Sequence, residues 1–309
     1  MTSIIDLKYL AQNNHLENRL MILSVNQKCN LKCSYCRGDM DDWYDKLALN
    51  SKNADLPKES WHDLIRICKQ INVDEILLTG GEPLLYKYLH EFTLFLKYNK
   101  ISFQIHTNGL SKKGMDYLSF LKKEGLCPIL NVSSELTNEM QEKIRGGMLP
   151  IKFIEKAISH GFRTEIKIVL HQELLPLINN LSHIINRWKS IGVSSIRFQP
   201  VAPIDNLKMD NLILTESFIP FLDKLLEIIK YDNNLRSFIG HSVESIEGIK
   251  SQISQSDFRL SLAKKCTIIN KMVFFNTDLE YLNCKTLWNR LEEDKCDKIF
   301  DFLCCGFQP

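Results

Sequence analysis

The segment CNLKCSYC, residues 29–36, places Cys29, Cys33 and Cys36 within eight positions, directly after the apolar run LMILSV. A structural zinc site needs four ligands, and no fourth Cys or His stands nearby. A dithiol redox site would leave Cys29 without a role. A cubane iron–sulfur cluster has four iron corners, so three cysteines would leave one iron open for chemistry. The loop by itself does not separate these three hypotheses.

A second group of cysteines lies near the end of the sequence. It consists of Cys266, Cys284, Cys296, Cys304 and Cys305, out of ten cysteines in all. Cys68 and Cys127 stand apart in apolar surroundings, where a buried and inert thiol is expected. A disulfide framework is not expected in a reducing compartment. Two separate groups of thiols therefore predict two metal sites.

The motif Gly80, Gly81, Glu82 and Pro83 closes the strand-like run EILLTG. Glycines allow a ligand to approach the backbone closely, and Glu82 offers an anion for an ammonium group. Taken alone, the motif is equally compatible with a plain turn.

These motifs are positioned by six strand-like runs that alternate with helix-like segments, as in βα units. The predicted strands are residues 20–27, 75–80, 102–108, 128–135, 164–170 and 194–200. The predicted helices are residues 57–71, 86–98, 111–124, 151–160, 174–191 and 215–231. This order predicts an α/β fold, a partial (β/α)6 TIM barrel with right-handed crossovers. Active sites of such barrels lie at the carboxyl ends of the strands, where both motifs fall.

Most of the predicted strands carry apolar residues on one face and polar residues on the other. In residues 102–108, Phe103 and Ile105 alternate with Gln104, His106 and Asn108. Since the helices must cover the apolar face, the polar face lines the lumen. The polar inner set also includes Ser24, Asn26, Thr79, Asn131, Ser133, Glu135, Glu165, Lys167, Ser195, Arg197 and Gln199. Unpartnered burial of such groups costs about 1–3 kcal/mol each, so the lumen is expected to hold water or a polar ligand.

The composition is that of a globular protein with one large domain and a small one. The 309 residues are 44% hydrophobic and 25% charged, with a formal net charge of +2. This balance gives no electrostatic case for binding nucleic acid or an anionic membrane. There is no secretory signal and no apolar stretch of roughly 20 residues that could span a bilayer. We therefore expect a cytoplasmic protein without nucleic-acid or membrane partners.

Taken together, these motifs resemble the radical S-adenosylmethionine (SAM) superfamily. CNLKCSYC matches its C-x3-C-x2-C signature, with the aromatic Tyr35 before the last cysteine, and GGEP matches its second motif. HTNG at 106–109, VSSE at 132–135 and EIKIVL at 165–170 look like its later strand ends. The resemblance spans residues 20 to 201.

The resemblance implies an enzyme, an oxidoreductase or isomerase. Cys29, Cys33 and Cys36 would hold a [4Fe–4S] cluster, and the amine and carboxylate of SAM would chelate its open iron. An electron from a donor such as flavodoxin or ferredoxin would cleave SAM, and the resulting 5′-deoxyadenosyl radical would take a hydrogen from the substrate.

The resemblance and the strand positions also suggest roles for particular side chains. The backbone of Gly80, Gly81 and Glu82, with the Glu82 carboxylate, would hold the SAM amine, and the backbone near Tyr35 would meet adenine. The expected contacts to SAM ribose or carboxylate are Ser133 and Lys167, with Asn108 as a weaker candidate. The expected substrate contacts are His106, Glu135, Arg197 and Gln199, where Glu135 replaces the usual Asp. Alternatives are a core role for His106, a salt bridge between Arg197 and Glu165, and a position on the rim for His171.

The segment CTIINKMVFFNTDLEYLNC predicts a hairpin flanked by Cys266 and Cys284. It resembles the start of the twitch or SPASM auxiliary-cluster extensions of radical SAM enzymes. Cys296 and Cys304 would complete a second [4Fe–4S] site, and one of Cys296, Cys304 and Cys305 would be spare. A zinc ribbon is the alternative. We therefore divide the chain into a barrel, residues 1–235, and an auxiliary-cluster domain, residues 236–309.

The architecture favours modification of a ribosomal peptide natural product, by epimerisation or crosslinking. The short stretch before the first strand weakens this hypothesis, since it leaves no room for a separate peptide-recognition domain. Oxidation or epimerisation of a small polar metabolite, such as an aminosugar, is the second candidate. The molybdenum-cofactor branch is disfavoured because its C-terminal cysteine spacing is absent. A non-enzymatic zinc-binding protein is the remaining alternative.

Overall fold

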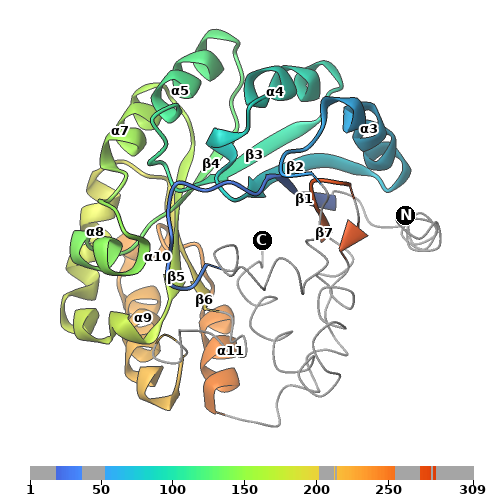
Figure 1. The fold of residues 1–309 in the computed structure, drawn as a ribbon. Helices are drawn as coiled ribbons and strands as arrows, with labels where there is room; N and C mark the ends of the chain where they lie inside the picture. Colours follow the sequence, from blue (N-terminus) through green and yellow to red (C-terminus); the bar gives the residue numbers. More distant parts are fainter. Residues whose placement is uncertain are drawn as a thin grey trace.

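The computed structural model describes residues 19–36, 53–201, 212, 214–254, 272–279 and 281–282. These residues form one curved sheet with helices along its outer side (Figure 1). The strand order is β6-β5-β4-β3-β2-β1-β7-β8, and all neighbours are parallel except β7 and β8. The strands are β1 (Arg19–Asn26), β2 (Val73–Gly80), β3 (Ser102–Thr107), β4 (Ile129–Ser133), β5 (Thr164–Leu170), β6 (Ser195–Pro200), β7 (Met272–Phe275) and β8 (Tyr281–Leu282). The predicted partial barrel is confirmed.

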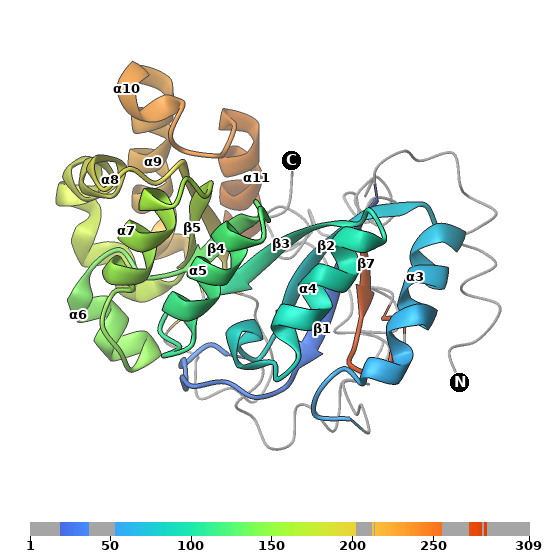
Figure 2. The same cartoon turned by 90° about the horizontal axis from the view of Figure 1, so that it is seen from above.

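Helices between the strands cover the outer side of the sheet, as Figure 2 shows from above. The main helices are α3 (Trp61–Gln70), α4 (Leu89–Tyr98), α5 (Gly114–Lys123), α7 (Ile151–Ser159), α8 (Leu181–Ser190), α9 (Ile219–Tyr231) and α11 (Val243–Ser254). Shorter helical turns are η2 (Lys58–Ser60), η3 (Pro83–Leu85), α6 (Asn138–Met140), η4 (Gln141–Arg145), η5 (Gln172–Asn180), η6 (Glu216–Phe218) and α10 (Asn233–Arg236). Several predicted helices begin too early, because η2, η5 and η6 precede the α-helices that they lead into.

The alternation of apolar and polar residues follows the two faces of the sheet. Ile105, Val132, Ile168 and Phe198 are fully buried beneath the helices. Residues between them on the same strands, such as Lys167, keep part of their surface exposed on the inner face. The burial of branched side chains between sheet and helices supplies the main hydrophobic stabilisation of the barrel. The inner face remains polar, as the sequence predicts.

The hairpin predicted near the end of the chain is present and joins the barrel sheet. β7 pairs in parallel with β1, so that Leu20 lies opposite Met272, and β8 returns antiparallel to β7. The hairpin turn is tied to the segment before α3, since Thr277 Oγ1 donates to the carbonyl of Asn53 at 2.6 Å. Cys266, Cys284, Cys296, Cys304 and Cys305 lie outside the described residues. The domain boundary at residue 235 therefore stays a prediction.

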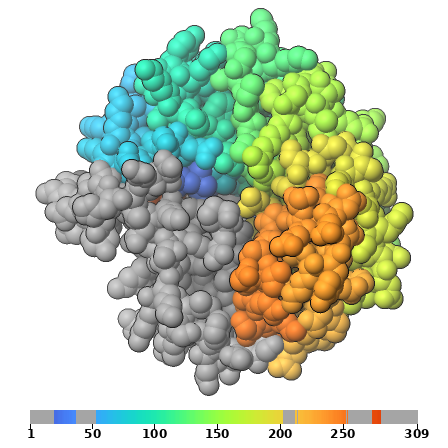
Figure 3. All heavy atoms as spheres, turned by 180° about the vertical axis from the view of Figure 1, so that it is seen from behind, coloured from blue at the N-terminus to red at the C-terminus, as the bar shows by residue number. Residues whose placement is uncertain are grey.

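The free edge of β6 is covered by the chain that follows α10. Ile196 N–H donates to the carbonyl of Phe238, and Gly240 N–H donates to the carbonyl of Ile196. In the space-filling view from behind, α9, α10 and α11 lie together beside α8 (Figure 3). Among the helices of the described ranges, none is long and apolar enough to cross a membrane.

Candidate functional site

The three-cysteine loop leaves β1 at the carboxyl end of the sheet. Cys29 is exposed, whereas Cys33 and Cys36 are partly buried. A tight turn, in which Cys36 N–H donates to the carbonyl of Cys33 at 2.9 Å, brings the last two cysteines together. Leu31 N–H points toward Cys29 Sγ at 3.5 Å.

The thiols of this loop are electrostatically coupled to one another. Burial, opposed by Arg145 and assisted by the neighbouring Cys36 and Cys29, raises the pKa of Cys33 to about 12. Burial also raises the pKa of Cys29. Closely spaced thiols with raised pKa values ionise readily only when a cation neutralises them, as metal binding does.

The donor set of the loop is three thiols. A cubane distributes three thiolates over three separate irons and keeps its fourth iron open. The three cysteines therefore fit a [4Fe–4S] cluster with one open corner.

The Gly-Gly motif lies directly against the start of the cysteine loop. Gly81 N–H donates to the carbonyl of Asn26 at 2.9 Å, and Glu82 N–H donates to the carbonyl of Lys28 at 2.7 Å. A Cβ on Gly80, whose φ is +135°, would lie 2.1 Å from the oxygen of Asn26. A Cβ on Gly81 would lie 2.2 Å from the oxygen of Lys28. Glycine is required here because the two backbones touch, so the two sequence motifs form one structural unit.

The Glu82 carboxylate is occupied by other groups of the protein. It is 1% exposed and accepts hydrogen bonds from Leu84 N–H, Thr107 Oγ1 and Asn108 N–H at 3.0, 2.6 and 2.7 Å. Burial raises its pKa to about 6, although these hydrogen bonds oppose the shift. This geometry does not support the expected contact of the carboxylate with the SAM amine. Glu82 instead ties the Gly-Gly motif to the end of β3.

Asn108 also faces the cysteine loop rather than the lumen. Its Nδ2 donates to Asn30 Oδ1 at 2.9 Å and lies 3.8 Å from Cys29 Sγ. Its Oδ1 accepts from Leu110 N–H at 2.8 Å. Asn108 therefore supports the loop that carries Cys29, a role that its position at a strand end alone does not predict.

His106 and Ser133 form a pair on the inner face. His106 Nε2 lies 2.6 Å from Ser133 Oγ. Burial, together with the positive charges of Lys167 and Arg145, lowers the pKa of His106 to about 4. The imidazole is therefore neutral at pH 7 and exchanges a hydrogen bond, not charge, with the hydroxyl.

Three described cations surround the carboxylate of Glu165 on β5. Glu165 Oε2 lies 3.0 Å from Lys167 Nζ and 3.4 Å from Arg197 Nε, so the salt bridge considered for Arg197 is present. Arg163 binds the other carboxylate oxygen at 2.7 Å. Burial lowers the pKa of Lys167 to about 8, although Glu165 opposes the shift. Gln199 lies two residues beyond Arg197 on β6 and is partly exposed.

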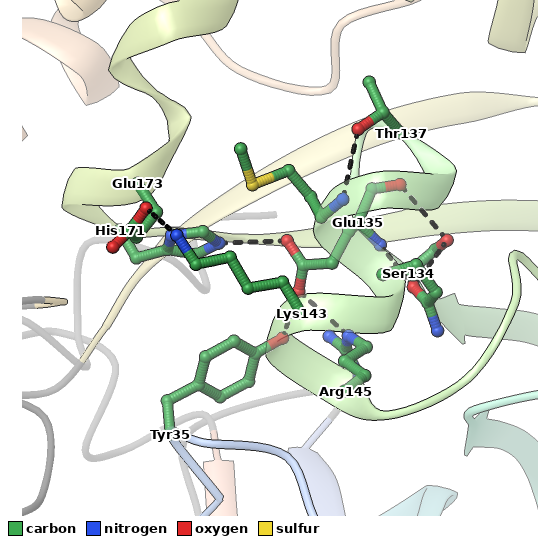
Figure 4. A network of polar contacts seen from close by, with 10 residues as sticks. Tyr35, Ser134, Glu135, Thr137, Lys143, Arg145, His171 and Glu173 are labelled. Carbon is green, nitrogen blue, oxygen red and sulfur yellow. Dashed lines mark hydrogen bonds and ion pairs between the residues drawn. The ribbon is translucent and has the colours of Figure 1, made fainter.

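Glu135 does not face the lumen. Its side chain is 0% exposed and lies among Tyr35, Arg145 and His171, with the Tyr35 ring reaching it from the cysteine loop (Figure 4). This geometry does not support the expected substrate contact. His171, a candidate for the rim from its sequence position, is 0% exposed. Arg145 carries no periodicity or motif that would mark it in η4.

Comparison with known proteins identifies the class. Residues 23–174 match the Radical SAM superfamily. A probable GTP 3′,8-cyclase of Methanococcus vannielii is 30% identical over 240 residues, which are 74% of this chain and 75% of that protein. A GTP 3′,8-cyclase of Staphylococcus epidermidis is 25% identical over 254 residues, 76% of this chain and 71% of that protein. The chain belongs to the radical SAM superfamily.

A solved structure supports the fold. SuiB of Streptococcus suis, bound to the precursor peptide SuiA, superimposes with a TM-score of 0.64 at 17% identity. The match covers 93% of this chain and 64% of SuiB, so the chain spans less than two thirds of that protein. Family membership favours the iron–sulfur hypothesis for the Cys29 loop over the zinc and dithiol alternatives.

Gly81→Ala tests the contact between the two motifs. The added Cβ would lie 2.2 Å from a backbone oxygen that has no rotamer to change. We expect the free energy of unfolding to fall by about 3 kcal/mol in urea titration. Gly248→Ala in α11 is the control, because its Cβ meets nothing within 4 Å, and it should stabilise the helix by about 0.5–1 kcal/mol. A Gly81→Ala chain as stable as wild type would contradict the contact.

Glu82→Gln tests the burial of that carboxyl through its pH dependence. A folded pKa of about 6, against an ordinary 4.5, favours the protonated carboxyl in the folded state. This stabilisation is complete below pH 4.5 and is lost as the pH rises through 6. The free energy of unfolding of wild type minus that of Glu82→Gln should therefore fall by about 2 kcal/mol between pH 4 and 7. A flat difference would show an ordinary folded pKa, and a difference that rises with pH would show that the hydrogen bonds outweigh burial. Either result would contradict the raised pKa.

Proposed function

We propose that this protein uses a [4Fe–4S] cluster on Cys29, Cys33 and Cys36 to cleave SAM reductively. The observation that carries the proposal is the union of two motifs at one place. The loop with three coupled thiols and the Gly80–Gly81 backbone pack against each other at the carboxyl ends of β1 and β2, next to the polar lumen. When bound, the cluster and SAM supply a 5′-deoxyadenosyl radical that removes a hydrogen from the substrate.

The residues of the chain position and shield this chemistry. Asn108 and the Gly80–Gly81 backbone hold the loop that carries Cys29 in place. The Gly80–Gly81 segment is partly buried and packs against residues 26–28, and its carbonyl oxygens are the groups that would accept from the SAM amine. The backbone near Tyr35 would meet adenine. Ser133, through its pairing with His106, is held on the inner face for a ribose contact. The electron would come from a donor such as flavodoxin or ferredoxin.

The lumen favours a polar substrate that carries an anionic group. Among the described residues, Lys167 and Arg197 are partly exposed on the inner face and both bind Glu165, while Arg163 binds the same carboxylate from the amino end of β5. An excess of cations in a partly desolvated space attracts a carboxylate or phosphate. We propose a peptide with an acidic group as the substrate.

A purine nucleotide is the second candidate. It is favoured by the relatives named GTP 3′,8-cyclase, which match three quarters of the chain. Those enzymes belong to the molybdenum-cofactor branch that the cysteine spacing disfavours. A nucleotide would present its phosphate to Lys167 and Arg197. A peptide would present a carboxylate to the same two cations. Small neutral metabolites such as aminosugars fit the charge of the lumen less well.

A second cluster on Cys266, Cys284, Cys296 and Cys304 is also part of the proposal. Because β7 runs parallel to β1, it begins at the amino end of the sheet, and β8 returns the chain to that end. In the sequence, Cys284 follows Leu282, the last residue of β8, by two positions.

Cysteine variants test the two clusters separately. Anaerobically reconstituted wild type should bind about eight irons per chain and convert SAM to 5′-deoxyadenosine with dithionite. Cys33→Ala should abolish SAM cleavage, because two thiols hold the first cluster poorly. Cys266→Ala should lower the iron content by about four but retain the SAM-sensitive electron paramagnetic resonance (EPR) signal. A colourless wild-type protein, or SAM cleavage by Cys33→Ala, would refute the first cluster.

Arg197→Ala tests the charge of the lumen. Loss of a charged hydrogen-bond donor should raise the KM for the substrate by about 10- to 100-fold. Acidic peptides and GTP are incubated separately with the reconstituted enzyme and SAM, and mass spectrometry identifies which one is modified. Arg187→Ala, on the exposed surface of α8, is the matched control and should leave KM unchanged. An unchanged KM in Arg197→Ala would exclude an anionic group at this position.

A further inference from the structure

The segment 135–147 contacts the cysteine loop at successive residues. Ser34 N–H donates to the carbonyl of Ile144 at 2.8 Å. Tyr35 Oη donates to Glu135 Oε1 at 2.6 Å. Arg145 Cζ lies 5.2 Å from the centre of the Tyr35 ring. The loop therefore rests on the chain that connects β4 to α7 as well as on the Gly-Gly motif.

Glu135 is the centre of this contact (Figure 4). Its Oε1 accepts from Tyr35 and from Arg145 Nε at 2.9 Å, and its Oε2 lies 3.0 Å from His171 Nε2. Its backbone N–H donates to Gln141 Oε1 at 2.9 Å. Neither Glu135 nor His171 is exposed, and Arg145 is 5% exposed. A buried carboxylate with this many fixed partners has one position available to it.

The contact reaches the loop at a sensitive point. Tyr35 stands between Cys33 and Cys36, inside the turn in which Cys36 N–H bonds to the Cys33 carbonyl. A displacement of the Tyr35 backbone would therefore disturb the turn that carries both thiols. Arg145, which holds Glu135, also acts electrostatically on Cys33.

We propose that Glu135 is a positioning residue for the cluster. Held by Arg145 and His171, its carboxylate fixes Tyr35, and Tyr35 fixes the separation at which Cys33 and Cys36 present their thiols. This inference rests on the proposed [4Fe–4S] cluster. Glu135 touches neither the cluster nor SAM in this role, and its effect passes through the loop.

Tyr35→Phe tests the proposal with the smallest change. It removes one O–H donor but keeps the aromatic ring, so the core packing is retained. We expect the SAM-sensitive cluster to lose iron to a chelator about 10-fold faster than in wild type. The EPR spectrum of the reduced cluster should also change, both with and without SAM. A purely structural role would alter the melting temperature without altering that spectrum.

Two further variants keep the experiment decisive. Glu135→Gln preserves the shape of the side chain but removes its negative charge. It should show the same faster iron loss and the same altered EPR spectrum. Glu173→Gln is the matched control, because it removes a carboxylate bound to Lys143 in η4 at 2.6 Å, away from Tyr35. It should behave as wild type in both measurements.

The outcomes separate this inference from the function on which it rests. If wild type takes up no iron, the proposed cluster is wrong, and the positioning role fails with it. If wild type binds the cluster while Tyr35→Phe and Glu135→Gln match it in iron loss and spectrum, the positioning role alone is overturned. Equal changes in Glu173→Gln would overturn it as well, since the effect would then not pass through Tyr35.

Discussion

The arrangement of the site depends on one close approach between two stretches of backbone. The N–H groups of Gly81 and Glu82 donate to the carbonyls of Asn26 and Lys28 at 2.9 and 2.7 Å. This separation leaves no room for a Cβ on Gly80 or Gly81. This contact sets where β1 ends and where the cysteine loop begins. It also directs the Glu82 side chain toward the end of β3, where Thr107 Oγ1 and Asn108 N–H donate to its carboxylate. The loop is thus braced by two neighbouring strands before any cofactor is present.

The polar lumen follows from a second constraint. A barrel covered by helices buries its outer face, so side chains that alternate with the buried ones must point inward. The inward-pointing polar residues bind one another in pairs and small groups, such as His106 with Ser133 and Glu165 with its three cations. Pairing reduces the cost of desolvation, and in the described part of the barrel three cations share the carboxylate of Glu165.

The sequence predicts those features that depend on local periodicity. The period of two residues locates the six barrel strands to within two residues of their observed bounds and assigns their faces correctly. It does not predict which side chains bind one another, because those contacts join segments far apart in the chain. Asn108 and Glu82 carry motif positions, yet their partners are set by how β1 and β3 meet at one end of the sheet. The pairing of β7 with β1 is equally invisible to local patterns.

Glu135 shows where the period of two stops being valid. Alternation from Asn131 and Ser133 places it on the inner face, but β4 ends at Ser133. Beyond that point the ladder gives way to local bonds: Ser134 N–H still reaches the carbonyl of Lys167, whereas Glu135 N–H binds the side chain of Gln141. The chain therefore turns, and the carboxylate lies between Tyr35 of the cysteine loop and Arg145. Ser133 therefore faces the lumen, whereas Glu135, two residues later, is fully buried and contacts Tyr35 of the cysteine loop.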